Sequence, residues 1–119
     1  MKRPMTTTTE TERMAAIEDY VSQHYLQELR MDDIAAQVGL TTTSLSRFFR
    51  HVTGKRLSQY ILELRMAHIC RLLRETDQPV SDICFSSGFN TLSNFNRLFK
   101  RYCGCTPTEY RNHLINNKI

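Results

Sequence analysis

Two stretches of this chain, residues 41–60 and 91–103, carry basic side chains and no acidic one. The cations are Arg47, Arg50, Lys55 and Arg56 in the first stretch and Arg97, Lys100 and Arg101 in the second. Residues 10–33 instead hold seven acidic and two basic residues, in a chain of net charge +4. Guanidinium groups can pair with guanine, and all these cations can neutralise phosphates. The segregated charge indicates a surface for a polyanion, with a solvated face of chance composition as the alternative.

The spacing of these side chains predicts that both stretches contain an amphipathic helix. The first helix is expected from about Thr41, its N-cap, to about Val52, before Gly54. Its polar and apolar faces are Thr43, Ser46, Arg47 and Arg50 on one side and Leu45, Phe48, Phe49 and Val52 on the other. The second is expected over 90–103. Its inner face is expected to consist of Leu92, Phe95, Phe99 and Tyr102, and its outer face of Asn94, Arg97 and Arg101.

The remaining pattern is also helical, so the expected fold class is all-α. Further helices are predicted from about Thr11 to Gln27, over 32–38, 56–75 and 80–87, and from the capping box Thr106-Pro107-Thr108-Glu109 onward. Residues 56–75 carry two apolar stripes, one containing His68, which we expect to be a core histidine. Two stripes predict burial on two sides, with a neighbour packed at each end of this helix. Residues 1–10 are expected to be a flexible lead or linker remnant.

The chain contains an internal repeat of about 50 residues. Ile34, Gly39 and Leu40 match Ile83, Gly88 and Phe89 at an offset of 49. At an offset of 50, Leu45, Arg47, Phe49, Arg50 and Gly54 match Phe95, Arg97, Phe99, Lys100 and Gly104. Each copy reads as a short helix, a glycine-centred turn and a longer helix. A repeated unit of this kind, with a basic second helix, indicates two helix-turn-helix motifs.

The motifs also resemble a known family. Gly88-Phe89, Ser93, Phe95, Arg97, Phe99-Lys100, Gly104, Thr106-Pro107 and Tyr110-Arg111 resemble the signature of the AraC/XylS family of bacterial transcription regulators, and residues 34–60 resemble its first helix-turn-helix. The resemblance covers about 11–115 and leaves 116–119 as a tail. It implies seven helices, with helix-turn-helix subdomains at about 32–52 and 81–103 and a linker helix at about 56–75. It also implies sequence-specific promoter binding, usually activating through RNA polymerase.

Carried onto this chain, the resemblance and the helical faces give a set of DNA-binding candidates. The recognition helices would present Thr43, Ser44, Ser46, Arg47 and Arg50, and Ser93, Asn94, Arg97, Lys100 and Arg101. Arg47 and Arg97 are expected at or near bases, and Asn94 at adenine or phosphate. The phosphate-binding candidates are Thr41, Lys55, Arg56 and Asn90, and Lys100 and Arg101 are also assigned to phosphates. Solvation alone is the alternative for each peripheral cation.

Other classes of function find less support in the sequence. No apolar run reaches the ~20 residues of a membrane span, and no secretory signal is visible, so a cytoplasmic, nucleoid-associated protein is expected. Cys70, Cys84, Cys103 and Cys105 are expected to be reduced, with Cys70 and Cys84 in the core. No metal site is expected at Cys103-x-Cys105, although exposed Cys105 leaves redox sensing open. No catalytic constellation is evident, so we expect neither an enzyme nor a cofactor.

The sequence thus predicts a double helix-turn-helix protein that binds double-stranded promoter DNA, probing successive major-groove segments. The competing hypothesis is a helical adaptor whose basic face binds an acidic protein. An effector, where one exists, is expected to bind a domain absent from these 119 residues. The oligomeric state, the target sites and the choice between activation and repression stay open.

Overall fold

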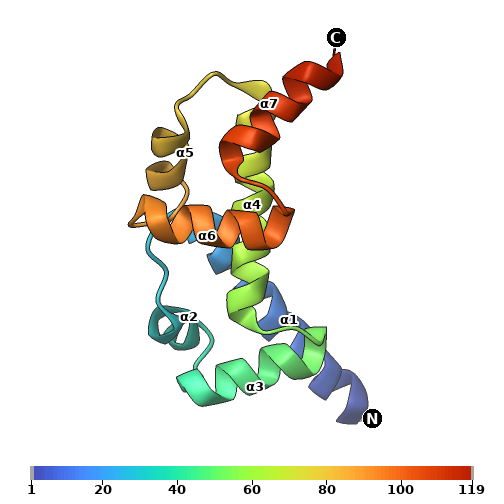
Figure 1. Ribbon diagram of the computed structural model, residues 1–119. Coiled ribbons are helices and arrows are strands. Elements are labelled where there is room, and N and C mark those ends of the chain that lie inside the picture. Colours follow the sequence, from blue (N-terminus) through green and yellow to red (C-terminus); the bar gives the residue numbers. More distant parts are fainter. Residues whose placement is uncertain (1, 119) are drawn as a thin grey trace. The chain divides into compact units, whose positions relative to one another are not determined.

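The computed structural model describes the backbone of residues 2–118 and the side chains of residues 9–113. Over residues 2–118 the chain forms seven helices and no strand (Figure 1), which confirms the all-α class. The helices are α1 (Lys2–His24), α2 (Met31–Gln37), α3 (Thr42–Thr53), α4 (Leu57–Glu75), α5 (Val80–Ser86), α6 (Leu92–Cys103) and α7 (Pro107–Lys118).

The helices divide between two compact units, each containing one helix-turn-helix. Unit 1 includes α1, α2, α3 and the start of α4 as far as Ile61. Unit 2 includes the rest of α4 from Leu62, together with α5, α6, α7 and the short segment 26–28. Leu57 and Ile61 are buried within unit 1, whereas Met66 and Ile69 are buried within unit 2. The two ends of α4 therefore enter different cores, as the two apolar stripes predict.

The core of unit 1 holds α3 in place from its inner side. Its buried residues are Ile17 and Val21 of α1, Ile34 and Ala35 of α2, Leu45 and Phe49 of α3, and Leu57 and Ile61 of α4. The Phe49 ring packs on Tyr60, with ring centroids 5.3 Å apart. Burial of these side chains is the main force that fixes the helix, since each removes a large apolar surface from water. The opposite face of α3 stays available to solvent.

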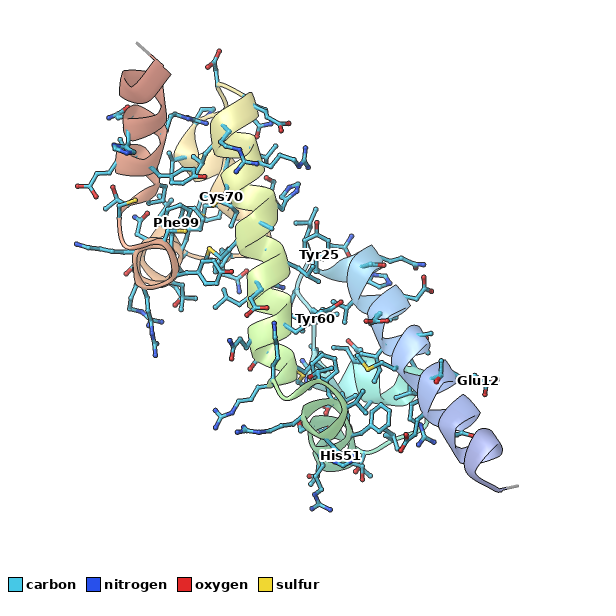
Figure 2. The ribbon with its side chains drawn as sticks, turned by 90° about the vertical axis from the view of Figure 1, so that its right-hand side faces the viewer. Glu12, Tyr25, His51, Tyr60, Cys70 and Phe99 are labelled. Atoms are coloured by element: carbon cyan, nitrogen blue, oxygen red, sulfur yellow. The ribbon has the colours of Figure 1, made fainter. Side chains whose placement is uncertain are left out.

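The core of unit 2 contains three phenylalanines packed in series. Phe89, Phe95 and Phe99 are buried, and successive ring centroids lie 5.3 and 6.1 Å apart. Tyr110 of α7 continues the series with an edge-to-face contact on Phe99 at 5.8 Å. Cys84 is fully buried in this cluster, which confirms it as a core residue. Half-buried Cys70, labelled on α4 in Figure 2, packs against the same cluster. Edge-to-face and tilted pairs of this kind add specificity to the burial.

Equivalent caps begin and end α3 and α6. The Thr41 hydroxyl accepts a hydrogen bond from the Ser44 amide at 3.1 Å, and the Thr91 hydroxyl accepts one from the Asn94 amide at 3.2 Å. Glycines in the left-handed conformation, Gly54 and Gly104, follow the two helices as C-caps. The N-cap predicted at Thr41 is confirmed. Because Thr91 is a cap, α6 begins at Leu92 and not at residue 90.

The outer helices differ in length from the sequence expectation. The first begins at Lys2 and ends at His24, so the segment expected to be a lead continues the helix from residue 2. Pro4 lies in the first turn, where the amide hydrogen that proline lacks has no intrahelical partner to lose. The last helix runs to Lys118 and includes most of the expected tail. Residues 1 and 119 lie outside the described part of the chain.

Three apolar side chains that the helical pattern places inside are exposed instead. Val52 is 44% exposed, Leu92 38% and Tyr102 52%. Val52 and Tyr102 occupy equivalent positions in the last turns of α3 and α6, beyond the buried Phe49 and Phe99. Leu92 is the first residue of α6, so no earlier turn covers it. The periodicity identifies the inner side of each helix but not the points where its neighbours end.

The second unit is closed by contacts of α7. The Thr106 amide donates to Glu109 Oε1 at 2.9 Å, and the Glu109 amide donates to Thr106 Oγ1 at 3.1 Å, which confirms the predicted capping box. The Arg111 guanidinium donates to the backbone carbonyls of Leu73, Thr76 and Gln78 at 3.2, 3.2 and 2.7 Å. Arg111 thus satisfies carbonyls at and beyond the C-terminus of α4, where the helix itself provides no donors.

Candidate nucleic-acid interface

The exposed face of α3 gathers the candidates of the first helix-turn-helix. Thr43, Ser46, Arg47 and Arg50 are exposed, and Ser44 is half-buried. Beneath them Phe48 is half-buried, and the Arg13 guanidinium of α1 lies 5.8 Å from its ring centroid. The start of α3 is tied to α2, because the Thr42 hydroxyl donates to Asp32 Oδ1 at 2.6 Å. The sequence therefore places hydrogen-bonding groups on a helix whose inner face and first turn are both held.

A hollow on α3 adds a residue that the sequence interpretation missed. Ser44, Arg47, Phe48 and His51 line an open depression of about 350 Å³. Figure 2 labels His51 near the end of α3, and its side chain is exposed. At the repeat offset of 50 residues, His51 occupies the position of Arg101. This equivalence is the signal that could have added it to the candidates.

The exposed face of α6 presents the second set of candidates. Ser93, Asn94, Arg97, Lys100 and Arg101 are all exposed. The Arg97 guanidinium donates a hydrogen bond to Asn94 Oδ1 at 2.6 Å, one turn earlier on the same helix. This bond restricts the rotamers of Arg97 and occupies part of the Asn94 amide. The predicted base contact of Asn94 therefore competes with its role as a partner of Arg97.

The turn between α5 and α6 is braced by an arginine of α4. Gly88 has φ +92°, and a Cβ atom built there would lie 2.7 Å from Arg65 Nε. The Arg65 guanidinium also lies 5.8 Å from the Phe89 ring centroid and donates to the Gln27 carbonyl at 2.8 Å. Burial lowers the pKa of Arg65. Gly88 thus suits the positive φ of the turn, and a side chain there would also displace the Arg65 guanidinium.

The phosphate-binding candidates surround the helix ends. Thr41 is the exposed N-cap of α3, and Asn90 is exposed one residue before the N-cap of α6. Lys55 and Arg56 are exposed between α3 and α4. Two ion pairs, Arg30–Asp32 at 3.9 Å and Arg71–Glu75 at 3.8 Å, involve residues outside α3 and α6. Neither α3 nor α6 contains an acidic residue, so the positive charge of each helix is not balanced within its own sequence.

The cysteines and His68 occupy less prominent positions. Cys70 Sγ and Cys103 Sγ lie 4.0 Å apart, and burial together with Cys70 and Cys105 raises the pKa of Cys103 to about 12. Cys105 is half-buried and not fully exposed as expected. His68 is half-buried rather than in the core. Its pKa is lowered by burial and by Arg71, whose guanidinium contacts His68 Nδ1 at 3.2 Å.

Neither a metal-binding cluster nor a membrane-spanning helix occurs within the described residues. Among the side chains of residues 9–113, His, Cys, Asp and Glu form no group of three or more that could hold a metal ion. Among residues 2–118, none of the helices combines the length and hydrophobicity that crossing a bilayer requires.

Known proteins share the sequence pattern and the fold of this chain over most of its length. Residues 34–113 match a helix-turn-helix domain family. The regulatory protein SoxS of Salmonella typhimurium (strain LT2) is 33% identical over 96 residues, which cover 81% of this chain and 90% of that protein. The DNA-binding domain of AdpA, a global transcriptional factor solved in complex with a target DNA, superimposes with a TM-score of 0.78 at 24% identity. That match covers 83% of this chain and 89% of the AdpA chain.

Other relatives are much longer than the matched region. The melibiose operon regulatory protein of Escherichia coli (strain K12) is 33% identical over 92 residues, which are 77% of this chain and 30% of that regulator. The chain therefore spans about a third of the length of such relatives.

Proposed function

The chain belongs to the AraC/XylS family of helix-turn-helix transcription regulators, and we propose that it binds promoter DNA sequence-specifically through α3 and α6. One observation carries the proposal. The two copies of the repeat present equivalent helices, each capped by threonine and glycine, and each with an exposed face rich in cations and free of acidic residues. A chance solvated face has no reason to occur twice at the same place in a repeat.

The exposed side chains divide by the chemistry they offer to DNA. Arg47 and Arg97 occupy equivalent central positions, and each guanidinium can donate two hydrogen bonds to guanine O6 and N7 in the major groove. Thr43, Ser44, Ser46 and Ser93 offer short hydroxyls that contact bases directly or through water. The Asn94 amide either pairs with adenine or accepts the hydrogen bond that positions Arg97. Each good bidentate pair contributes about 1–3 kcal/mol of discrimination between bases.

Other groups bind the backbone and set the register. We assign Lys55, Arg56, Lys100 and Arg101 to phosphates, with Arg50 and His51 at the outer edge of α3. Thr41 and Asn90 lie at the entries of the recognition helices, where backbone amides suit a phosphate. Such contacts position the protein but carry no sequence information. We expect α3 and α6 to enter successive major-groove segments about one helical turn, ~34 Å, apart.

The biological role follows as a further part of the proposal. A matched relative from Mannheimia succiniciproducens is named as a transcriptional activator, which favours activation through RNA polymerase for this chain too. We place the protein in the cytoplasm at the nucleoid. An effector, where one exists, would bind a domain outside these 119 residues. The hypothesis of an adaptor for an acidic protein has no support among the relatives.

Site selection from a random duplex library, followed by salt-titrated affinity for the winning duplex, tests the proposal. We expect an enriched motif of two short blocks, bound far more tightly than random DNA. Arg47→Ala should relax one block and Arg97→Ala the other, each by about 5- to 150-fold at the affected base pair. Salt-sensitive binding without any enriched motif would reduce the function to backbone contact and would overturn the proposal.

A further inference from the structure

An exposed leucine stands at the entry of the second recognition helix. Leu92 is the first residue of α6, and 38% of its surface is exposed. It follows the cap residue Thr91 directly and precedes the exposed polar residues Ser93 and Asn94. In helix-turn-helix proteins the N-terminal residues of the recognition helix are the ones that reach base edges. An apolar side chain is therefore exposed at the part of α6 best placed to read sequence.

The first copy of the repeat uses the same position differently. Thr42 is the equivalent residue of α3, and its hydroxyl donates to Asp32 Oδ1 of α2 at 2.6 Å. In the second copy, Leu92 replaces Thr42, and Ser81 stands at the position of Asp32. A leucine side chain cannot donate or accept a hydrogen bond. Leu92 therefore cannot form the equivalent of the Thr42–Asp32 hydrogen bond, which joins α2 to α3 in the first motif.

The surroundings of Leu92 identify what would cover it. The outer face of α6 carries Arg97, Lys100 and Arg101, all exposed, with no acidic residue in the helix. An apolar protein partner would have to strip water from these cations without pairing them, which is costly. A DNA duplex neutralises them and also presents one apolar group in its major groove, the 5-methyl of thymine.

We propose that Leu92 is a specificity-determining residue that packs against a thymine 5-methyl in the half-site of α6. The inference rests on the proposed DNA-binding function and adds the identity of one base to it. Arg97 would read its part of the half-site by hydrogen bonds, and Leu92 would read a neighbouring position by apolar contact. The first half-site would lack this apolar reading, because Thr42 is held by Asp32.

Deoxyuridine substitution tests the contact directly, since uracil differs from thymine only by the missing methyl group. Each thymine of the selected duplex is replaced singly by deoxyuridine, and the dissociation constant is measured. For the unchanged protein we expect one position in the α6 half-site at which uracil weakens binding about three- to fivefold, the worth of one buried methyl. Leu92→Ala should abolish this sensitivity, and Leu92→Met should retain it.

Tyr102→Ala is the matched control, because Tyr102 is another exposed large side chain of α6, 52% exposed and at the opposite end of the helix. It should leave the thymine preference unchanged. Thermal unfolding of each variant verifies that the surface substitution has not altered the fold.

Two results would overturn the inference while leaving the proposed function intact. In the first, Arg97→Ala relaxes the base preference of the half-site, but Leu92→Ala leaves the effect of every thymine-to-uracil replacement on the dissociation constant unchanged. In the second, Leu92→Ala weakens thymine and uracil duplexes equally, which would assign Leu92 to the helix and not to the base. A library that yields no motif at all would instead refute the proposed function, and the inference with it.

Discussion

The Arg97 guanidinium donates a hydrogen bond to the Asn94 side-chain oxygen across one turn of α6, at 2.6 Å. In α3 the equivalent residues are Arg47 and Ser44, so the longer amide partner is replaced by a short hydroxyl. One of the two arginines proposed to read bases is therefore held in place before DNA arrives. Side-chain ordering on binding costs about 0.5–1.5 kcal/mol for a flexible residue, and the Asn94 contact should reduce that cost.

Asn94→Ala should accordingly weaken specific DNA binding by about 2- to 10-fold. Ser44→Ala, the matched change in the first copy, should have a smaller effect. The cycle with Arg97→Ala separates two roles of Asn94. If Asn94 acts through Arg97, Asn94→Ala should no longer weaken DNA binding in the Arg97→Ala background. Persistence of the full effect there would show that Asn94 contacts DNA itself and would contradict the positioning role.

The cations at the C-terminal end of α6 should affect the salt dependence of DNA binding and not its base preference. Lys100→Ala should weaken all duplexes alike and reduce the slope of log affinity against log salt concentration by about one unit. Arg71→Ala is the control, since Arg71 lies on α4 and pairs with Glu75 at 3.8 Å. It should leave the slope unchanged. A changed base preference with an unchanged slope in Lys100→Ala would assign Lys100 to a base and refute its phosphate role.

Two turn glycines should differ in their tolerance of alanine. Gly39 has φ +67° and open space around a built Cβ, whereas Gly88 has φ +92° and meets the Arg65 guanidinium. Gly39→Ala should cost about 1–2 kcal/mol of unfolding free energy for the left-handed backbone alone. Gly88→Ala should cost about 1 kcal/mol more, because Arg65 would have to move away from Gln27 and Phe89.

Urea denaturation of the two glycine variants, alone and combined with Arg65→Ala, measures the difference. The extra cost at Gly88 should disappear in the Arg65→Ala background. Equal costs for Gly39→Ala and Gly88→Ala in the otherwise unchanged chain would remove Arg65 from the explanation.

The capping box of α7 should make stability depend on pH in the acid range. The Thr106 backbone amide, and then its hydroxyl, lower the pKa of Glu109 from its ordinary value of 4.5. A lowered carboxyl pKa adds stability that is present above pH 4.5 and is lost as the pH falls through the lower folded value. Glu109→Gln keeps an acceptor for the Thr106 amide but removes the titration. Thermal unfolding between pH 7 and 3 should show a shallower acid decline for Glu109→Gln, and identical profiles would contradict this account.

Much of the fold was predictable from the sequence because the decisive signals are local or repeated. Gly39 and Gly88 mark the two turns, and Phe49 and Phe99 mark the inner faces of α3 and α6 at the same place in the repeat. Thr41 and Thr106 are caps whose partners lie three residues away. Interactions over so short a separation are visible in the order of residues alone.

The rest depends on contacts between distant parts of the chain. Arg65 reaches Gly88 and Gln27 from another helix, and no periodicity links these three positions. Leu92 is exposed because α6 begins at this residue. The helical periodicity of the sequence does not give the residue at which a helix begins. Apart from half-buried Ser44, the candidate DNA-binding residues are exposed, as their pattern predicts. The pairing of Asn94 with Arg97 became visible only from three-dimensional positions. Their roles on DNA stay predictions.

Methylation interference on the selected duplex tests most directly that both recognition helices read DNA. Methylation of guanine N7 blocks the major-groove contacts that arginine makes. We predict two groups of interfering guanines about one helical turn apart on one face of the duplex. Arg47→Ala should erase one group and Arg97→Ala the other. A single group of interfering guanines, or the loss of both groups in each variant, would contradict the account of two independent recognition helices.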